Sequence, residues 1–384
     1  MASVVETAPL VLDVGAVLLV AATSAFAARK VGLPAIVGYL LTGLVVSPFT
    51  PGFVADSNQL ALLADIGVVL LLFEVGIEID LRRIRREHGA LLWAAPVQVL
   101  FGTFLGTLVF TIVGIELFGS ALLALSLAMS SSVVIVNITR SRRRTTSVET
   151  EEALLGWSVL QDITGVAAAA LIIALLGDTG ESALTSVLGL VGFIITAYAA
   201  SRIIPFILKQ LRWENDLFLI YSVAIGLSIA ALGTVLFNIP MALASFVAGL
   251  AINQSRDTDE VRKAVLPFRD LFQVLFFVVI GSLIEPALIS EALPFAALLL
   301  LLMALLKTVP ALLFAHFGHI GASSAQLAVG LSQVGEFSFV LGSAALVAGA
   351  ITKVQFTGVL LAVVSSIIIS TLAVRKASRL SRSI

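Results

Sequence analysis

The chain has 384 residues, of which 59% are hydrophobic and only 12% are charged, and its mean hydropathy is +1.10. A soluble globular domain is excluded, because this composition would leave large apolar patches in contact with water. Cysteine is absent, which excludes disulfides and thiolate metal sites. The formal net charge of −1 gives no sign of a polyanionic partner, and we expect no nucleic acid to bind.

Apolar runs recur along the whole chain, and most of them are long enough to cross a bilayer core of about 30 Å as a helix. The start of the sequence lacks a basic segment, so the first run is interpreted as a span and not as a cleaved signal. The runs predict an all-α polytopic membrane protein with about 13 transmembrane helices. They lie near residues 10–28, 34–50, 60–79, 90–113, 118–139, 151–176, 184–207, 215–235, 240–253, 267–284, 293–316, 324–348 and 355–374.

The positive charges are distributed very unevenly between the two sides of these spans. Segments that follow odd-numbered spans carry 21 of the 23 Lys and Arg residues, whereas Lys353 alone lies on the opposite side and Lys307 lies within a span. Cytoplasmic loops carry such an excess, and a wrong span count would have scrambled it. The N-terminus is therefore predicted outside and the C-terminus in the cytoplasm, in a prokaryotic inner or plasma membrane.

Spans 2–6 and 9–13 form two inverted five-helix repeats, because span 2 begins inside and span 9 begins outside. Spans 5 and 12 occupy matching positions, and small or polar residues interrupt both at mid-depth. Small residues also let helices pack closely, but that explanation suits one such span better than a matched pair. Crossed, broken helices in inverted repeats predict a secondary transporter whose site lies near the bilayer midplane. The interrupting residues are Ser130, Ser131, Ser132 and Asn137 in span 5, and Gly330, Ser332, Gln333, Gly335 and Glu336 in span 12.

Asp162 is the strongest candidate for a functional residue. At a rise of about 1.5 Å per residue it lies near the middle of span 6, where an ionised carboxylate is costly. A proton and a cation can therefore compete for this group. Ser158, Asp162 and Gly165 follow i, i+4, i+7 spacing, which predicts one small, polar face toward span 5.

Hard monovalent cations need oxygen ligands, and the residues near Asp162 can supply them. The Gln161 carbonyl, the serine hydroxyls of span 5 and opened backbone carbonyls are the candidates. The predicted site for the monovalent cation and the proton comprises Asp162, Gln161, Ser130, Ser131 and Ser132.

Lys307 and Glu336 lie at a similar depth and are interpreted as charge partners of the site. Lys307 would be either a functional switch or one half of an ion pair with Asp162 or Glu336. Glu336 would be either a second carrier or a structural residue of its broken helix. Glu74, near the cytoplasmic end of span 3, is expected to reach water.

Other functional classes stay open at this point. An organic-anion or bile-acid-like transporter would need a roomier pocket and a basic anchor, for which Lys307 is the only candidate. A cation channel would need a repeated carbonyl filter loop, which the sequence lacks. Because protease, P-loop and dinucleotide motifs are also absent from the sequence, we expect neither an enzyme nor a cofactor.

The QD pair in LGWSVLQDITGV resembles the ion-binding helix of the monovalent cation:proton antiporter 2 family, especially its Kef-type potassium:proton antiporters. Four further segments look like elements of this family, so the resemblance covers essentially the whole chain. They are LLFEVGIEIDL, SSSVVIV, FFVVIGSLIEP and SQVGEFSFVLG.

The resemblance implies a sodium/proton antiporter-like fold and an elevator movement within one membrane domain, residues 1–384. Spans 4–6 and 11–13 would form the ion-carrying core, spans 1–3 and 8–10 a dimerisation scaffold, and span 7 a linker. Asp162 would carry the ion, Gln161 would replace a second acid, and Lys307 would match the basic position of span 11.

The expected activity is exchange of K⁺, or alternatively Na⁺, for H⁺. Since the pair of Gln161 and Asp162 bears only one negative charge, the exchange is expected to be electroneutral.

The expected partners are the lipid bilayer and a second copy of the chain. The chain ends about ten residues after span 13. We therefore expect no cytoplasmic nucleotide-binding domain of the kind that many Kef-type proteins carry; either the sequence is truncated, or a separate cytoplasmic subunit regulates the protein.

Overall fold

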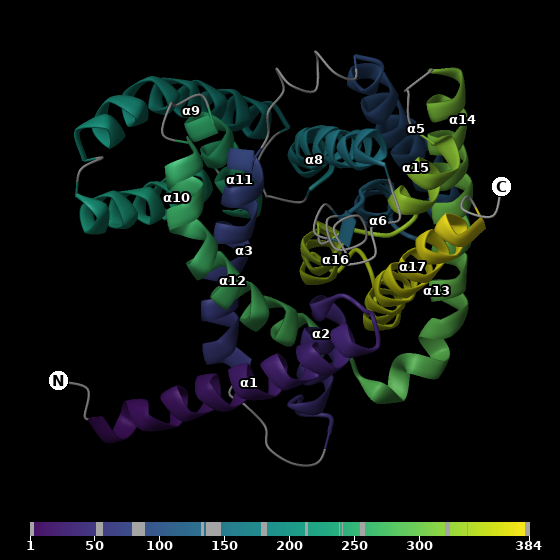
Figure 1. Ribbon diagram of the computed structural model, residues 1–384, viewed down its shortest axis with the longest axis horizontal. Coiled ribbons are helices and arrows are strands. Elements are labelled where there is room, and N and C mark those ends of the chain that lie inside the picture. The colour runs from purple at the N-terminus through teal and green to yellow at the C-terminus, as the bar shows by residue number, and fades with distance from the viewer. Residues whose placement is uncertain are drawn as a thin grey trace. The chain divides into compact units, whose positions relative to one another are not determined.

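The computed structural model describes residues 4–50, 57–78, 89–131, 134–135, 147–177, 183–211, 214–237, 239, 241–253, 258–318, 323–335 and 337–380. The regular secondary structure in these ranges is entirely helical (Figure 1). The helices divide between two compact units. Residues 1–80 and 180–285 form the first unit, and residues 81–179 and 286–384 form the second.

The first unit is built around α3, which packs closely against α11 and α12. In the same unit α2 packs against α1 and α12, and α10 packs against α9 and α11. The helices are α1 (Val4–Lys30), α2 (Ala35–Val45), α3 (Ser57–Glu78), α9 (Ala183–Leu211), α10 (Asn215–Phe237), α11 (Met241–Asn253) and α12 (Thr258–Ser282).

Glycines allow the closest of these helix contacts. A Cβ at Gly43 of α2 would overlap the Val278 carbonyl of α12. A Cβ at Gly249 of α11 would overlap the Phe73 carbonyl of α3. Because α2 and α11 are the first helices of the two predicted repeats, and α3 and α12 the second, these two contacts are equivalent. The repeat is therefore visible in the packing of the first unit.

The same glycines offer no support for a dimer. Gly38 and Gly43 on α2 and Gly249 on α11 are small residues at which a second copy of the chain could in principle approach closely. Gly38 instead lies against the backbone of Ala25 in α1, and the other two glycines face α12 and α3. Their small size is explained by packing inside one protomer.

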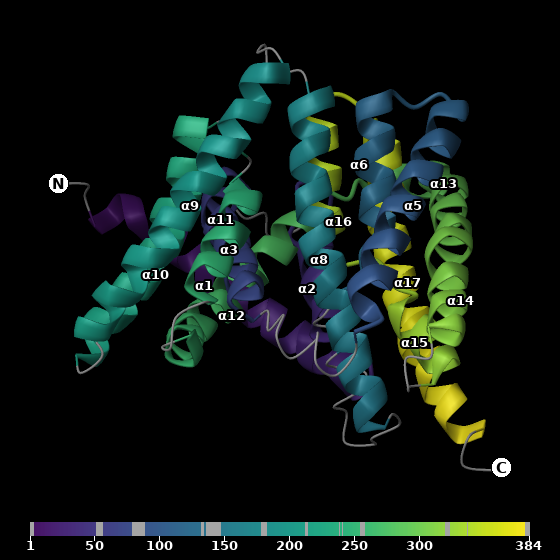
Figure 2. The ribbon, with the colours of Figure 1, turned by 90° about the horizontal axis from the view of Figure 1, so that it is seen from above.

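The second unit contains the helices of spans 4–6 and 11–13. Helices α5, α6 and α8 lie side by side in it, and α13 packs along α17 (Figure 2). The elements are α5 (Leu91–Ile112), α6 (Leu117–Ala128), α8 (Val148–Leu176), the short η1 (Pro286–Leu288), α13 (Ile289–Met303), the π-helical turn η2 (Ala304–Thr308), α14 (Val309–Phe317), α15 (Ser324–Leu331), α16 (Phe337–Val347) and α17 (Lys353–Leu380).

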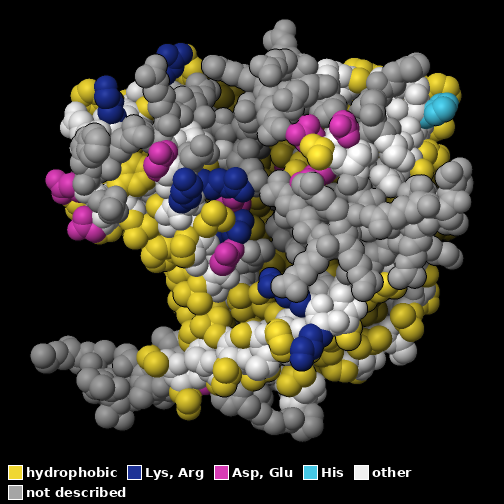
Figure 3. Space-filling view, in the orientation of Figure 1, with side chains coloured by type: hydrophobic (Ala, Val, Ile, Leu, Met, Phe, Trp, Pro, Cys, Tyr) yellow, Lys and Arg dark blue, Asp and Glu magenta, His cyan; other side chains and the backbone are white. Residues whose placement is uncertain are grey.

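Nine helical segments among the described residues are long and apolar enough to cross a membrane, and four shorter apolar helices accompany them. The shorter ones are Ala35–Val45, Leu117–Ala128, Leu243–Ile252 and Phe337–Val347. The polytopic, all-helical prediction is confirmed, whereas the count of thirteen spans stays a prediction. Large apolar side chains cover much of the described surface, as expected for a protein surrounded by lipid (Figure 3).

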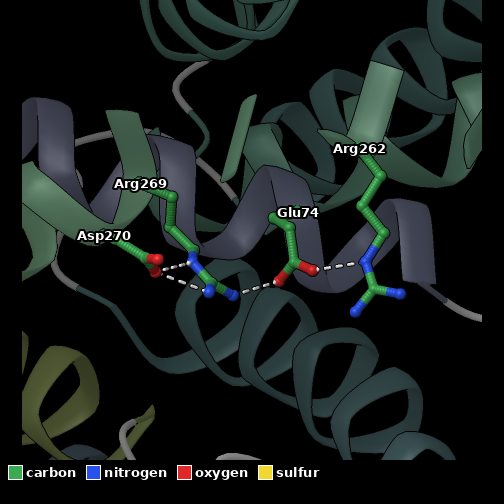
Figure 4. A network of polar contacts seen from close by, with 4 residues as sticks. All are labelled: Glu74, Arg262, Arg269 and Asp270. Carbon is green, nitrogen blue, oxygen red and sulfur yellow. Dashed lines mark hydrogen bonds and ion pairs between the residues drawn. The ribbon is translucent and has the colours of Figure 1, made fainter. Parts of the chain in front are cut away.

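The prediction that Glu74 reaches water is wrong. Its side chain is only 1% exposed and lies between two arginines of α12 (Figure 4). Arg262 Nε and Arg269 Nη1 each contact a Glu74 carboxylate oxygen at 2.8 Å. The error has a simple cause: hydropathy assigned residues before 267 to a loop, whereas α12 begins at Thr258. The earlier start brings Arg262 onto the helix and against α3.

Candidate functional site

Two interrupted helices meet inside the second unit. Helix α6 ends at Ala128, and Met129 is extended, with φ −97° and ψ 144°. Helix α15 ends at Leu331 and α16 begins at Phe337. The breaks are bonded to each other, since the Gly335 N–H donates to the Met129 carbonyl at 3.1 Å. The predicted interruption of both spans is therefore confirmed, and the two breaks cross.

A reciprocal pair of hydrogen bonds closes the crossing. The Ser131 N–H donates to Gln333 Oε1 at 3.0 Å, and Gln333 Nε2 donates back to the Ser131 carbonyl at 3.1 Å. The Gln333 side-chain amide thus supplies Ser131 with the acceptor and the donor that other peptide groups would supply within a helix. Ser130 adds a third link, because its hydroxyl donates to the Leu331 carbonyl at 2.8 Å.

Lys307 lies at this crossing, and its side chain is 1% exposed. Its Nζ donates to the Met129 carbonyl at 3.0 Å and to the Gln333 carbonyl at 2.6 Å, so one ammonium group joins both breaks. The sequence suggested Asp162 or Glu336 as an ion-pair partner, and that pairing stays a prediction. The π turn that carries Lys307 is an irregularity often found at functional sites.

Asp162 is on α8, 3% exposed, and its two flanking residues face the first break. One turn before it, the Ser158 hydroxyl donates to the Ser130 carbonyl at 3.5 Å. Nearly one turn after it, Gly165 packs against the Met129 side chain, and a Cβ there would overlap the sulfur. The predicted shared face of α8 is thus directed at the break in α6, and it carries a carboxylate.

Gln161 also contacts the break, in company with a residue that the sequence interpretation missed. Gln161 Oε1 accepts from the Ser130 N–H at 3.2 Å, and its Nε2 donates to Gln98 Oε1 at 2.5 Å. Gln98 Nε2 donates in turn to the Ala128 carbonyl at 3.3 Å. Gln98 is fully buried on α5. A lone amide in the apolar stretch WAAPVQVLFG was the signal that could have identified it.

The structure brings together most of the predicted site residues. Asp162, Gln161, Ser130, Ser131 and Lys307 surround the two breaks, and all are buried. The remaining two predicted residues, Ser132 and Glu336, lie outside the described residues.

A cavity of about 10 Å³ lies next to Lys307, between α5, α6 and α13. Small side chains line much of it, among them Gly102, Gly106 and Ala124. It has room for about one water molecule and none for an organic anion. This cavity therefore gives no support to an organic-anion site anchored on Lys307.

Residues 15–377 match the family described as sodium/hydrogen exchanger, transmembrane. The chain is 30% identical to the "Putative cation/proton antiporter YbaL" of Escherichia coli (strain K12), over 94% of this chain and 70% of that protein. Its fold is similar to two structures of the sodium proton antiporter MjNhaP1 from Methanocaldococcus jannaschii, at 16% identity. The pH 8 structure gives a TM-score of 0.75 over 95% of this chain and 97% of that one. The electron-microscopy structure gives 0.61 over 96% and 93%. The predicted resemblance is confirmed, and the chain belongs to the sodium/hydrogen exchanger family.

Proposed function

We propose that the protein exchanges a monovalent cation for H⁺ across the membrane and that Asp162 carries either ion in turn. Membership of the sodium/hydrogen exchanger family supports cation/proton antiport as the general activity. The observation that carries the assignment to Asp162 is its position. It is a buried carboxylate on an unbroken helix, and its neighbours on both sides contact the break of α6.

The chemistry of this position suits a competition between two ions. A buried carboxylate either holds a proton or stays charged beside a cation, since a lone buried charge is costly. Oxygen atoms near the break supply further ligands, chiefly the Ser130 carbonyl and the serine hydroxyls. Ser130 and Ser131 are each no more than 3% exposed, so an ion bound among them exchanges water for protein oxygens.

K⁺ is the favoured cation and Na⁺ the alternative. The preference rests on the QD pair, Gln161 and Asp162, which resembles the ion-binding helix of Kef-type potassium:proton antiporters. Because the pair has a single titratable group, the loaded site has the same net charge with either ion, and exchange is electroneutral.

Alternating access occurs by an elevator movement of the second unit, which carries Asp162, both broken helices and Lys307. The first unit is the scaffold through which two copies form a homodimer. A detergent-corrected mass equal to one protomer, in a preparation that still exchanges ions, would contradict the dimer.

The 21 Lys and Arg residues on one side of the predicted spans support a cytoplasmic C-terminus and an external N-terminus.

Everted membrane vesicles with a dye that reports the pH gradient test the proposal. Addition of K⁺ or Na⁺ to vesicles with the wild-type protein should dequench the dye, and the ratio of the two responses gives the preference. Asp162→Asn should abolish the response, while immunoblots show the same amount of protein in the membrane. Asp216→Asn, which neutralises an exposed carboxylate in the first turn of α10, is the matched control and should exchange normally. Cation-dependent proton flux through Asp162→Asn would overturn the proposal.

A further inference from the structure

Gln98 and Gln161 connect α5 and α8 to the break in α6 through an unbroken series of hydrogen bonds. The series starts at the Ser130 N–H, passes through the Gln161 amide and then the Gln98 amide, and ends at the Ala128 carbonyl. We call these two side chains the glutamine relay. It starts and ends on the same extended turn, so it spans the point at which α6 stops.

We propose that the glutamine relay positions the Met129–Ser130 peptide for cation binding and thereby tunes affinity and selectivity at the site. Gln98, which touches no ion, is then a positioning residue that acts through Gln161. The inference rests on the proposed function, because the peptide matters only if a cation binds beside Asp162.

The backbone alone fixes the direction of the relay. A carbonyl such as that of Ala128 only accepts, so Gln98 must present its Nε2 there and its Oε1 to Gln161. Gln161 must then donate with Nε2, which leaves its Oε1 for the Ser130 N–H. Flipping either amide would set two donors or two acceptors against each other. Both amides are thus locked, and Gln161 cannot turn its oxygen away from the break without losing both bonds.

The held peptide unit is fixed at both of its ends. In a trans peptide the N–H and the preceding C=O point in opposite directions. The Ser130 N–H points to Gln161, and the Met129 carbonyl accepts from Lys307 Nζ and the Gly335 N–H. Rotation of this peptide would therefore break bonds on both sides.

The relay also determines where the next carbonyl points. The Ser130 carbonyl faces Ser158 on α8, one turn from Asp162. A carbonyl on that face is an oxygen ligand for an ion bound to the carboxylate. Loss of Gln161 removes the bond to the Ser130 N–H, and loss of Gln98 leaves the Gln161 amide free to turn away from it. In both cases the Ser130 carbonyl is no longer held in place. We expect weaker cation binding, and a changed ratio of K⁺ to Na⁺ affinity, with a smaller effect on the maximal rate.

The first test is a double-mutant cycle with Gln98→Met, Gln161→Met and the combined variant, assayed for the KM of K⁺ and of Na⁺. Each single change cuts the relay, so each should raise the KM by about tenfold. The double variant should be little worse than the more damaging single variant, because a relay already cut cannot be cut again. Independent, additive effects would overturn the relay, and unchanged KM values would overturn its role in binding.

The matched control is Val99→Ala, the residue after Gln98 on α5. Val99 is fully buried, but it donates and accepts nothing in the relay. This variant should lose thermal stability without a change in KM. If it raised the KM as much as Gln98→Met does, the effect would come from the packing of α5, and the proposal would fail.

Hydrogen exchange followed by mass spectrometry gives a readout that does not depend on transport. A peptide that includes Ser130 should take up deuterium faster in Gln98→Met than in the wild type and in Val99→Ala. Equal uptake in all three would overturn the relay even if the protein is an antiporter. If uptake is faster in Gln98→Met but the wild-type protein exchanges no cation, the relay stands and the proposed function is contradicted.

Discussion

Lys307 and Gln161 bind opposite ends of one peptide unit, the carbonyl of Met129 and the N–H of Ser130. The buried lysine of span 11 and the amide beside the proposed ion carrier are therefore connected through the four atoms of one peptide group. A change at either side chain can therefore reach the other through this peptide.

Lys307→Met should destabilise the second unit by about 1–3 kcal/mol, because the Gln333 carbonyl loses its bond to Nζ while the Met129 carbonyl keeps the Gly335 N–H. Methionine preserves most of the side-chain volume, so lost packing contributes little. We also expect cation exchange that is slowed but still measurable, in contrast to Asp162→Asn. Thermal unfolding in detergent and the vesicle assay measure the two effects. Wild-type stability in this variant would show that the ammonium does not hold the crossing together.

Gln333→Leu should be at least as damaging as Lys307→Met. It removes both reciprocal bonds to Ser131 and leaves a peptide N–H and a carbonyl without their amide partner in a buried place. Each such group costs about 1–3 kcal/mol when its partner is lost. Gln210→Leu, in the exposed last turn of α9, is the control and should change stability by no more than about 0.5 kcal/mol. Equal unfolding temperatures for the two variants would count against the crossing as a stabilising element.

Glu74→Gln should be strongly destabilising, whereas Asp270→Asn should not. Removal of one member of a buried ion pair typically costs about 3–5 kcal/mol, because the partner stays buried and unpaired. The low end is expected here, since Arg262 is 35% exposed and Arg269 is 17% exposed. Asp270 contacts the same Arg269 but is 63% exposed, so its loss should cost at most about 1 kcal/mol. Similar stabilities for the two variants would mean that Glu74 is not the anchor of α12.

Hydropathy and charge located the helices well, because apolar length and Lys/Arg asymmetry are properties of the sequence itself. The predicted span 151–176 compares with Val148–Leu176, and both interruptions lie where small and polar residues cluster.

The sequence did not reveal which residues each buried polar side chain contacts. Glu74 was placed in water because its arginines lie 188 and 195 residues away. Lys307 donates to the carbonyls of Met129 and Gln333, and backbone acceptors of this kind cannot be identified from residue types alone. Gln98 went unnoticed because its hydrogen-bond partners, Gln161 and the Ala128 carbonyl, lie on other helices.

The last prediction concerns stoichiometry. Asp162 is one carboxylate, and the Gln161 amide beside it is engaged at both ends, by the Ser130 N–H and by Gln98 Oε1, and carries no charge. One carboxylate binds either one proton or one monovalent cation, so the loaded site has the same net charge in both directions.

Lys307 would upset this balance of charge if it released a proton whenever a cation binds. Its Nζ donates a hydrogen bond to each of two backbone carbonyls, which hold the side chain at the crossing of the two breaks. We therefore expect one-for-one exchange that the membrane potential does not drive. Proteoliposomes with fixed Na⁺, K⁺ and pH gradients should show the same reversal point with and without valinomycin, which sets a membrane potential from the same K⁺ gradient. Because one charge gains about 2.3 kcal/mol per 100 mV, an electrogenic cycle would move that point visibly. Such a movement in wild type that is absent in Lys307→Met would identify the lysine as the source of the second proton.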